Sequence, residues 1–347
     1  MNGINRTPFL SICIPTYNRA EHVFSMVNEI LNCPTEEIEV IVLDNCSTDS
    51  TKDLLNSILD KRLVFIQNPY NIGGVSNSIK VLTIANGEYA LLCLDRDHVE
   101  CKNIPSFIQK LHQNKDIVMG FSSFELNENI SDMIFKEGFD SVLNMAFLSK
   151  HPSGNFYKTN VLNNLKRIKE TNINSIEFAF YHELINSEIS FLGRTLKINT
   201  PMISAGYLNS KEDFAINKSH SYNTSNYYFI PSKRKIEYFT YISNTSKLNL
   251  SSKEKKHLYL TIFLRGLISS TFAFKKDMMN SKICSHYNIP KRKVTFPELL
   301  RIDLDYLTYF LNLPIGLGIF SKIYISVLAH LRLSNYFIKS FIKKYSR

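Results

Sequence analysis

Two carboxylates, Asp95 and Asp97, stand one residue apart at the end of an apolar run of strand length, residues 89–94. Side chains alternate along an extended segment, so residues i and i+2 point the same way and both carboxylates can face one hard cation. Mg²⁺ typically binds one or two protein carboxylates together with substrate phosphates. The pair therefore indicates a metal site for a phosphorylated substrate. The alternative is a solvated turn that follows a buried strand.

The elements that must position this pair alternate between strand and helix patterns. Apolar runs rich in β-branched residues, at 10–15, 39–43 and 63–66, are typical of buried strands. Each run is followed by polar residues and then by a helical pattern. Strand alternating with helix predicts a mostly parallel α/β sheet, and such sheets bind ligands at the carboxyl ends of their strands.

Four motifs resemble those of the family 2 glycosyltransferases of GT-A fold, in that family's order and spacing. They are residues 14–19 (IPTYNR), 43–49 (LDNCSTD), 71–77 (NIGGVSN) and 87–97 (GEYALLCLDRD). The rest of the chain is similar, more loosely, to bacterial enzymes that build O-antigen or capsule, including abequosyltransferase-like members. The resemblance implies a mixed, mostly parallel sheet flanked by helices. It also implies a nucleotide-diphosphate sugar donor, Mg²⁺ or Mn²⁺, and an acceptor hydroxyl.

The resemblance also assigns roles to residues at the strand ends. Asp97 matches the carboxylate that binds the metal bridging the diphosphate, and Asp95 matches one that contacts the ribose or the metal. Asp44 matches the carboxylate that accepts a hydrogen bond from the base. The residues expected to bind the donor are Pro15, Thr16, Tyr17, Asn18, Arg19, Asp44, Asn45, Ser47, Asn71, Gly73, Asn77, Asp95 and Arg96.

Structural interpretations compete with several of these assignments. Asp44 and Asp49 can cap the helix that follows them. Gly73 with Gly74 can form an ordinary turn, and Tyr17 can serve packing.

The acceptor hydroxyl needs a general base within hydrogen-bond reach. The family usually carries an acidic pair at the start of a helix, and residues 177–184 contain no such pair. Glu183 is the first candidate, and the adjacent His182 is an alternative base or orienting group. Glu177 is the third candidate, although it also lies three residues after Asn174, as in a capping box. Inverting transfer needs such a base and retaining transfer does not, so both outcomes stay open.

Two further segments have a possible role at the site. Residues 151–157 resemble the family's small-residue motif beneath the acceptor and sugar, where Gly154 would permit a close backbone approach; an ordinary Pro-Gly turn is the alternative. His220 is a candidate third metal ligand on a loop, or else a solvated histidine.

Charge divides the chain into two parts. The net charge is +10, yet residues 206–347 hold 23 Lys and Arg against 8 Asp and Glu. We expect a glycosyltransferase domain over residues 1–210 and a basic, mainly helical extension over 211–347. The six cysteines include no CxxC pair and no signal peptide precedes the first strand, which favours a cytoplasmic protein with reduced thiols.

The end of the chain has the composition of a membrane-surface segment. Residues 306–321 carry no charge, and from Tyr306 onward the sequence holds six basic residues and no acidic one. This composition favours an interfacial helix on an anionic inner leaflet, against a helix packed on its own domain. No nucleic-acid-binding signature is present, so nucleic acid is not an expected partner.

These observations predict a metal-dependent glycosyltransferase at the cytoplasmic face of the inner membrane. Its expected partners are a nucleotide-sugar donor, a glycan acceptor linked to undecaprenyl diphosphate, and the membrane surface. The alternatives are a sugar-phosphate nucleotidyltransferase and an inactive, membrane-attached scaffold of the same fold. The first usually has a Gly-rich basic loop, which residues 14–18 lack.

Overall fold

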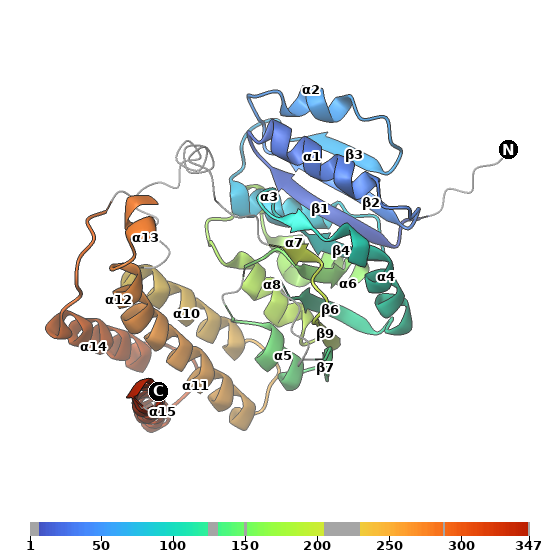
Figure 1. The fold of residues 1–347 in the computed structure, drawn as a ribbon. Coiled ribbons are helices and arrows are strands. Elements are labelled where there is room, and N and C mark those ends of the chain that lie inside the picture. Colours follow the sequence, from blue (N-terminus) through green and yellow to red (C-terminus); the bar gives the residue numbers. More distant parts are fainter. Residues whose placement is uncertain (1–6, 124–130, 149–150, 205–229, 287–288, 346–347) are drawn as a thin grey trace. The chain divides into compact units, whose positions relative to one another are not determined.

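A computed structural model describes residues 7–123, 131–148, 151–204, 230–286 and 289–345 (Figure 1). The chain divides into two compact units, Met1–Leu208 and Asn209–Arg347.

The first unit is built on an eight-stranded sheet with the order β3-β2-β1-β4-β8-β6-β9-β7. Its strands are β1 (Leu10–Thr16), β2 (Ile38–Asp44), β3 (Leu63–Gln67), β4 (Tyr89–Leu92), β6 (Ile117–Ser122), β7 (Met133–Phe135), β8 (Asn155–Lys158) and β9 (Arg194–Ile198). Strands β1 to β4 pair in parallel, as do β6 and β9, whereas β8 and β7 run antiparallel to their neighbours. A separate pair joins β5 (His98–Val99) to β10 (Ile203–Ser204). The predicted mostly parallel α/β architecture is confirmed.

Helices flank this sheet (Figure 1). They are α1 (Ala20–Leu31), α2 (Thr51–Asn56), α3 (Gly74–Thr83), α4 (Ile104–Gln113), α5 (Phe139–Met145), α6 (Thr159–Asn164), α7 (Lys166–Glu170) and α8 (Tyr181–Ile189), with short 3-10 turns η1 (Cys101–Asn103) and η2 (Ile173–Ser175). Every residue of β1 and β2 is buried, as expected for strands covered on both faces.

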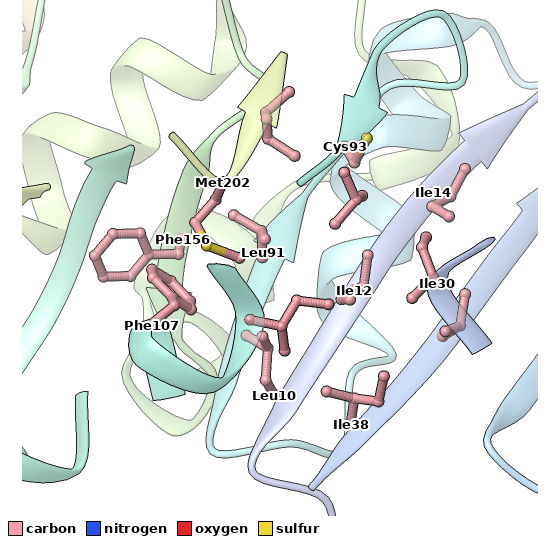
Figure 2. Packing of buried hydrophobic residues seen from close by; sticks show 14 of the residues in the cluster. Leu10, Ile12, Ile14, Ile30, Ile38, Leu91, Cys93, Phe107, Phe156 and Met202 are labelled. Carbon is pink, nitrogen blue, oxygen red and sulfur yellow. The ribbon is translucent and has the colours of Figure 1, made fainter. Parts of the chain in front are cut away.

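The main core of this unit lies where α1 and α4 pack on the sheet. Alternate residues of β1, including Leu10 and Ile12, share one hydrophobic cluster with Ile30 of α1 and Phe107 of α4 (Figure 2). Helix α3 packs against β1, β2 and β4 and contributes nothing to this cluster. This packing fixes the strands whose carboxyl ends carry the candidate site.

The second unit is helical in the residues that the structure describes. It contains α10 (Pro231–Ser246), α11 (Ser252–Ile268), the π-helical η3 (Ser269–Ala273), α12 (Phe274–Asp277), α13 (Ser281–His286), α14 (Phe296–Asn312) and α15 (Ile319–Tyr345). A capping box between Ser251 and Glu254 starts α11. Gly266, near the end of α11, permits close packing of this helix against Tyr306 of α14, since a Cβ on Gly266 would collide with the Tyr306 hydroxyl oxygen.

The uncharged segment 306–321 differs from its expected form. It is not one helix, because α14 ends at Asn312 and α15 begins at Ile319. Pro314 lacks an N–H, and Gly316 adopts φ +69°, so the chain turns between the two helices. By length and composition, one described helix is able to cross a membrane, Ser252–Asp277, and 56% of its apolar window is buried. This burial is also typical of a core helix.

Candidate functional site

The carboxyl ends of four strands bring the predicted donor residues to one edge of the sheet. Thr16 of β1 lies in register with Asp44 of β2, and Asp44 lies in register with Gln67 of β3. Strand β4 pairs on the other side of β1. The loops after β1 and β4 therefore meet at the point where the strand order reverses, the usual ligand position in such sheets.

Asp95 joins these two loops. Its Oδ2 accepts a hydrogen bond from the Thr16 hydroxyl at 3.0 Å and one from the Tyr17 N–H at 3.4 Å. Its Oδ1 lies 3.5 Å from Nε of Arg19. Burial raises the pKa of Asp95, and the nearby Arg19 guanidinium partly opposes that rise. Asp95 is thus occupied mainly with holding the loop after β1.

Asp97 is more deeply buried than Asp95 and has fewer partners. It is 3% exposed, and its Oδ2 accepts a hydrogen bond of 2.5 Å from the Ser153 hydroxyl. Nδ1 of His151 lies 3.6 Å from the same oxygen. The other oxygen, Oδ1, has no hydrogen-bond partner among the residues that the structure describes. Asp97 therefore combines a fixed orientation with an oxygen that remains available to a ligand.

Ser153 sets this orientation. It belongs to the segment 151–157 that was expected beneath the acceptor and sugar, but a role at Asp97 was not expected. Its hydroxyl also accepts a hydrogen bond from the Leu94 N–H at 2.9 Å, and the side chain is fully buried. Gly154 follows with φ +85°, and a Cβ there would lie 2.9 Å from the Ser122 carbonyl oxygen. The close backbone approach at Gly154 is thus to the chain itself.

Arg96 and His151 form the rim of this site. Nη2 of Arg96 lies 2.6 Å from Nε2 of His151. Burial lowers the pKa of His151 to about 4, and the neighbouring charges of Arg96 and His182 act in the same direction, whereas Asp97 opposes them. The ring is therefore neutral at neutral pH and can accept a hydrogen bond from Arg96.

Asp44 is fully buried and surrounded by donors from its own chain. Its oxygens accept hydrogen bonds from the Ser47 N–H, the Ser47 hydroxyl and, at 2.8 Å, the Gln67 amide. Asp49 accepts hydrogen bonds from the N–H groups of Ala20 and Thr51, each at 3.1 Å. Both carboxylates serve to fix loops in this conformation.

An amide network fixes the loop after β3. Asn45 donates to Asn71 at 2.9 Å, and Asn77 donates to the Leu43 carbonyl at 2.8 Å. Asn68 donates to both Asn45 and Asn77. Gly73 precedes α3 with φ +87°, a conformation that only glycine adopts without strain. This network joins the loops after β2 and β3 to the first turn of α3.

Two residues at this edge have an unusual backbone conformation. Asn18 (φ 52°) and Cys46 (φ 65°) lie in the left-handed region, which is uncommon for residues other than glycine. The loops that contain them are joined, because the Asn18 N–H donates to the Ser47 hydroxyl at 2.8 Å and the Thr48 N–H donates to Asn18 at 2.7 Å. Such conformations persist where surrounding contacts impose them, often at binding sites.

The candidate bases lie at the start of α8. Glu183 is 1% exposed, and its Oε2 accepts a hydrogen bond of 3.2 Å from the Leu148 N–H. Nε2 of His182 lies 3.7 Å from Oε1 of Glu183. Glu177 is exposed and precedes the helix. No capping box forms with Asn174, because Asn172 caps η2 instead.

The remaining assigned residues are placed as follows. Pro15 is a buried residue of β1 in register with Leu43, and Tyr17 is half-buried. His220, the expected third metal ligand, lies outside the described residues. Within them, no group of three or more His, Cys, Asp or Glu side chains converges on one point, so a metal there would draw its remaining ligands from the substrate and water.

Comparison with known proteins agrees with this geometry. The family described as Glycosyl transferase family 2 matches residues 11–165. The chain is 28% identical over 120 residues to the Escherichia coli UDP-Glc:alpha-D-GlcNAc-diphosphoundecaprenol beta-1,3-glucosyltransferase WfaP, covering 35% of this chain and 47% of that protein. It is 33% identical over 85 residues to the abequosyltransferase RfbV of Salmonella typhimurium, covering 23% of this chain and 26% of that protein. The match thus spans about half the length of WfaP and about a quarter of the length of RfbV.

A solved structure shares the fold. The S. aureus TarS 1–349 structure in complex with UDP-GlcNAc superposes with a TM-score of 0.56 and 14% sequence identity, covering 86% of this chain and 81% of that one. The motif order, the strand topology and the matched domain agree: residues 11–165 match the family 2 glycosyltransferases, and the chain has the GT-A fold.

Proposed function

We propose that this protein transfers a sugar from a nucleotide-diphosphate donor to a hydroxyl of a bacterial surface glycan, O-antigen or capsule, in a metal-dependent reaction. The family assignment supports the reaction class. The printed name of WfaP includes a diphosphoundecaprenol acceptor, and this supports a lipid-linked acceptor here. Such an acceptor would place the reaction at the cytoplasmic face of the inner membrane.

The observation that carries the proposal is the state of Asp97. The Asp97 side chain is 3% exposed, and among the described residues its Oδ1 is not one of the buried polar atoms that lack a partner, so this oxygen is open to solvent or a ligand. Here Oδ2 is held by Ser153 and Oδ1 has no hydrogen-bond partner among the described residues. A divalent cation fits such a group, with its other ligands drawn from Asp95, diphosphate oxygens and water. When bound, Mg²⁺ or Mn²⁺ supplies Lewis-acid stabilisation of the charge on the departing diphosphate.

The loops after β1, β2 and β3 would hold the nucleotide. Asp95 contacts Thr16, Tyr17 and Arg19 and fixes the loop after β1. The segment that would bind the base is therefore joined directly to a carboxylate that would lie near the diphosphate. Asp44 would act on the base through the loop that it orders at Ser47, since its own oxygens are buried. Asn71 and Gly73 would close over the nucleotide from the other side.

We assign the base role to His182 and an orienting role to Glu183. A carboxylate that faces one nitrogen of a histidine orients the ring and leaves the other nitrogen to accept a proton. The distance of 3.7 Å between Nε2 of His182 and Oε1 of Glu183, together with the hydrogen bond from Leu148 to Glu183, supports this order of roles. His182→Gln should abolish transfer while donor binding, measured by calorimetry, stays unchanged. Retained transfer would exclude this base.

The full chain should be tested with UDP-, GDP-, CDP- and dTDP-sugars, with and without Mn²⁺, first by thermal shift and then by transfer. The acceptor is a short-chain analogue of undecaprenyl-diphosphate-linked GlcNAc. A ligand that binds only the native state raises its melting temperature. Metal-dependent sugar transfer supports the proposal, and the anomeric configuration of the product distinguishes inverting from retaining chemistry. Pyrophosphate release from a nucleoside triphosphate and a sugar phosphate would instead identify a nucleotidyltransferase, and the absence of both reactions would identify a scaffold.

A further inference from the structure

Helix α15 exposes an apolar face along its described side chains, residues 319–334. This outer face consists of Phe320, Ile323, Tyr324, Val327 and Leu331, with exposed fractions of 85%, 44%, 65%, 54% and 57%. Their spacing of three or four residues places them in one stripe along the helix. An ordinary surface helix of a globular protein shows the opposite pattern, with charged residues toward solvent.

The inner face of the same helix contains polar groups. Lys322 is 7% exposed, and its Nζ donates to the carbonyl oxygens of Leu311 at 2.8 Å and Leu313 at 2.6 Å. It thereby satisfies carbonyl groups at the end of α14. Ser326, 4% exposed, donates to the Lys322 carbonyl, and Nε2 of His330 lies 3.0 Å from Oδ1 of Asp303.

These inner contacts fix the rotation of α15 about its axis. Turning the helix to bury Phe320 and Val327 would remove Lys322 from the end of α14 and separate His330 from Asp303. Polar groups that lose buried partners carry a free-energy cost. The apolar face is therefore held outward by the polar contacts on the opposite side.

Helix α14 provides a contrast within the same unit. It also exposes leucines, such as Leu300 at 47% and Leu304 at 54%. Charged residues that form ion pairs are interspersed with them, since Glu298 pairs with Arg292 and Asp305 pairs with Lys235. The outer face of α15 contains no charged residue between Phe320 and Leu331.

The charge of the surrounding sequence indicates what covers this face. No acidic residue follows Asp305, whereas Arg332 is exposed directly after the stripe. An anionic bilayer attracts such a segment, whereas a second basic copy repels it. The stripe is also only about 16 Å long by helical rise, which is small for a stable dimer that needs roughly 800 Å² on each partner.

We propose that the outer face of α15 binds an anionic lipid bilayer, with the helix lying along the surface and its apolar side chains at the boundary of headgroups and acyl chains. The proposal does not depend on the transfer reaction, because vesicle binding is measured without donor or acceptor.

The test is flotation of the full chain with vesicles of phosphatidylglycerol and phosphatidylethanolamine, compared with vesicles of phosphatidylcholine. Val327→Ser combined with Leu331→Ser should lower the partition coefficient on anionic vesicles at least about tenfold. The matched control is Leu192→Ser, which removes a leucine of similar exposure, 55%, from the first unit. Circular dichroism checks that each variant is folded, and Phe320→Ser replaces the double variant if that one is not.

The proposal is overturned if the wild type does not bind anionic vesicles, or if the double variant binds them as well as the wild type. It is also overturned if Leu192→Ser loses as much binding as the double variant. Light scattering without vesicles tests whether a second copy of this chain covers the outer face of α15 instead. A wild-type oligomer that the double variant dissociates would show that the face joins copies of this chain.

Discussion

Strands β2 and β4 end at the same edge of one sheet, and aspartates follow the two strands in different states. Asp44, at the end of β2, is fully buried and receives hydrogen bonds on both oxygens from Ser47 and Gln67. Asp97, in the loop after β4, is nearly as buried, yet Ser153 holds only one of its oxygens. The two carboxylates thus share residue type and position at the sheet edge, and they differ in the number of internal partners. Asp44 is fully engaged in fixing its loop, whereas Asp97 keeps one oxygen without a hydrogen-bond partner among the described residues.

The largest expected effect concerns the carboxylate with the available oxygen. Asp97→Asn keeps an acceptor for the Ser153 hydroxyl but removes the negative charge, so we expect transfer to fall about a thousandfold with little change in melting temperature. Transfer assays at saturating Mn²⁺ and calorimetry measure the two quantities. Asp53→Asn, on the exposed surface of α2, is the matched control. Activity close to that of the control would remove the distinction drawn between Asp44 and Asp97.

The reverse pattern is expected for Asp44. Asp44→Ala leaves the Ser47 N–H and the Gln67 amide without their acceptor, so unfolding should become easier by about 3 kcal/mol. Urea denaturation of the variant and of Asp53→Ala gives the difference. A variant that is as stable as the wild type but no longer binds the nucleotide would mean that Asp44 acts on the base directly.

A smaller effect is expected from the group that orients Asp97. Ser153→Ala removes the hydroxyl that both donates to Asp97 and accepts from the Leu94 N–H. Loss of such a supporting contact typically weakens metal affinity about tenfold. A Mn²⁺ titration of the transfer rate should therefore shift to higher concentration while the rate at saturation is recovered. Ser106→Ala, on an exposed part of α4, should leave the titration unchanged.

The parallel half of the fold could be predicted from the sequence because each buried strand is a continuous apolar run. The predicted strands at 10–15, 39–43 and 63–66 agree with β1, β2 and β3 to within one residue at each end. The mainly helical extension expected over residues 211–347 gave no sign of irregularities within its helices. The π-helical segment η3 between α11 and α12 is an example, because local packing decides such irregularities.

Residues 151–157 were expected at the site, but the contacts of Ser153 and His151 with Asp97 could not be predicted, and the reason is topological. In a parallel sheet the ligand edge lies at the carboxyl ends of the strands, so the residues that follow strands are the expected candidates. Strand β8 runs antiparallel to β4, so the residues that precede it reach that edge. A serine or histidine just before a strand gives no sign of this unless the strand's direction is known. The number of partners around Asp44 could not be read from its motif either, because one donor, Gln67, comes from the separate strand β3.

The antiparallel placement of β8 also has a consequence during synthesis. Asp97 and the Ser153 hydroxyl that orients it are separated by 56 residues of chain. At bacterial translation rates, the ribosome needs about 3–11 s to add that length. Strands β1 to β4, with the loops that order Asp44 and Asp95, precede that interval entirely. A nascent chain therefore has the loops of Asp44 and Asp95 before Asp97 acquires its orientation, and the candidate site becomes complete only when β8 has emerged.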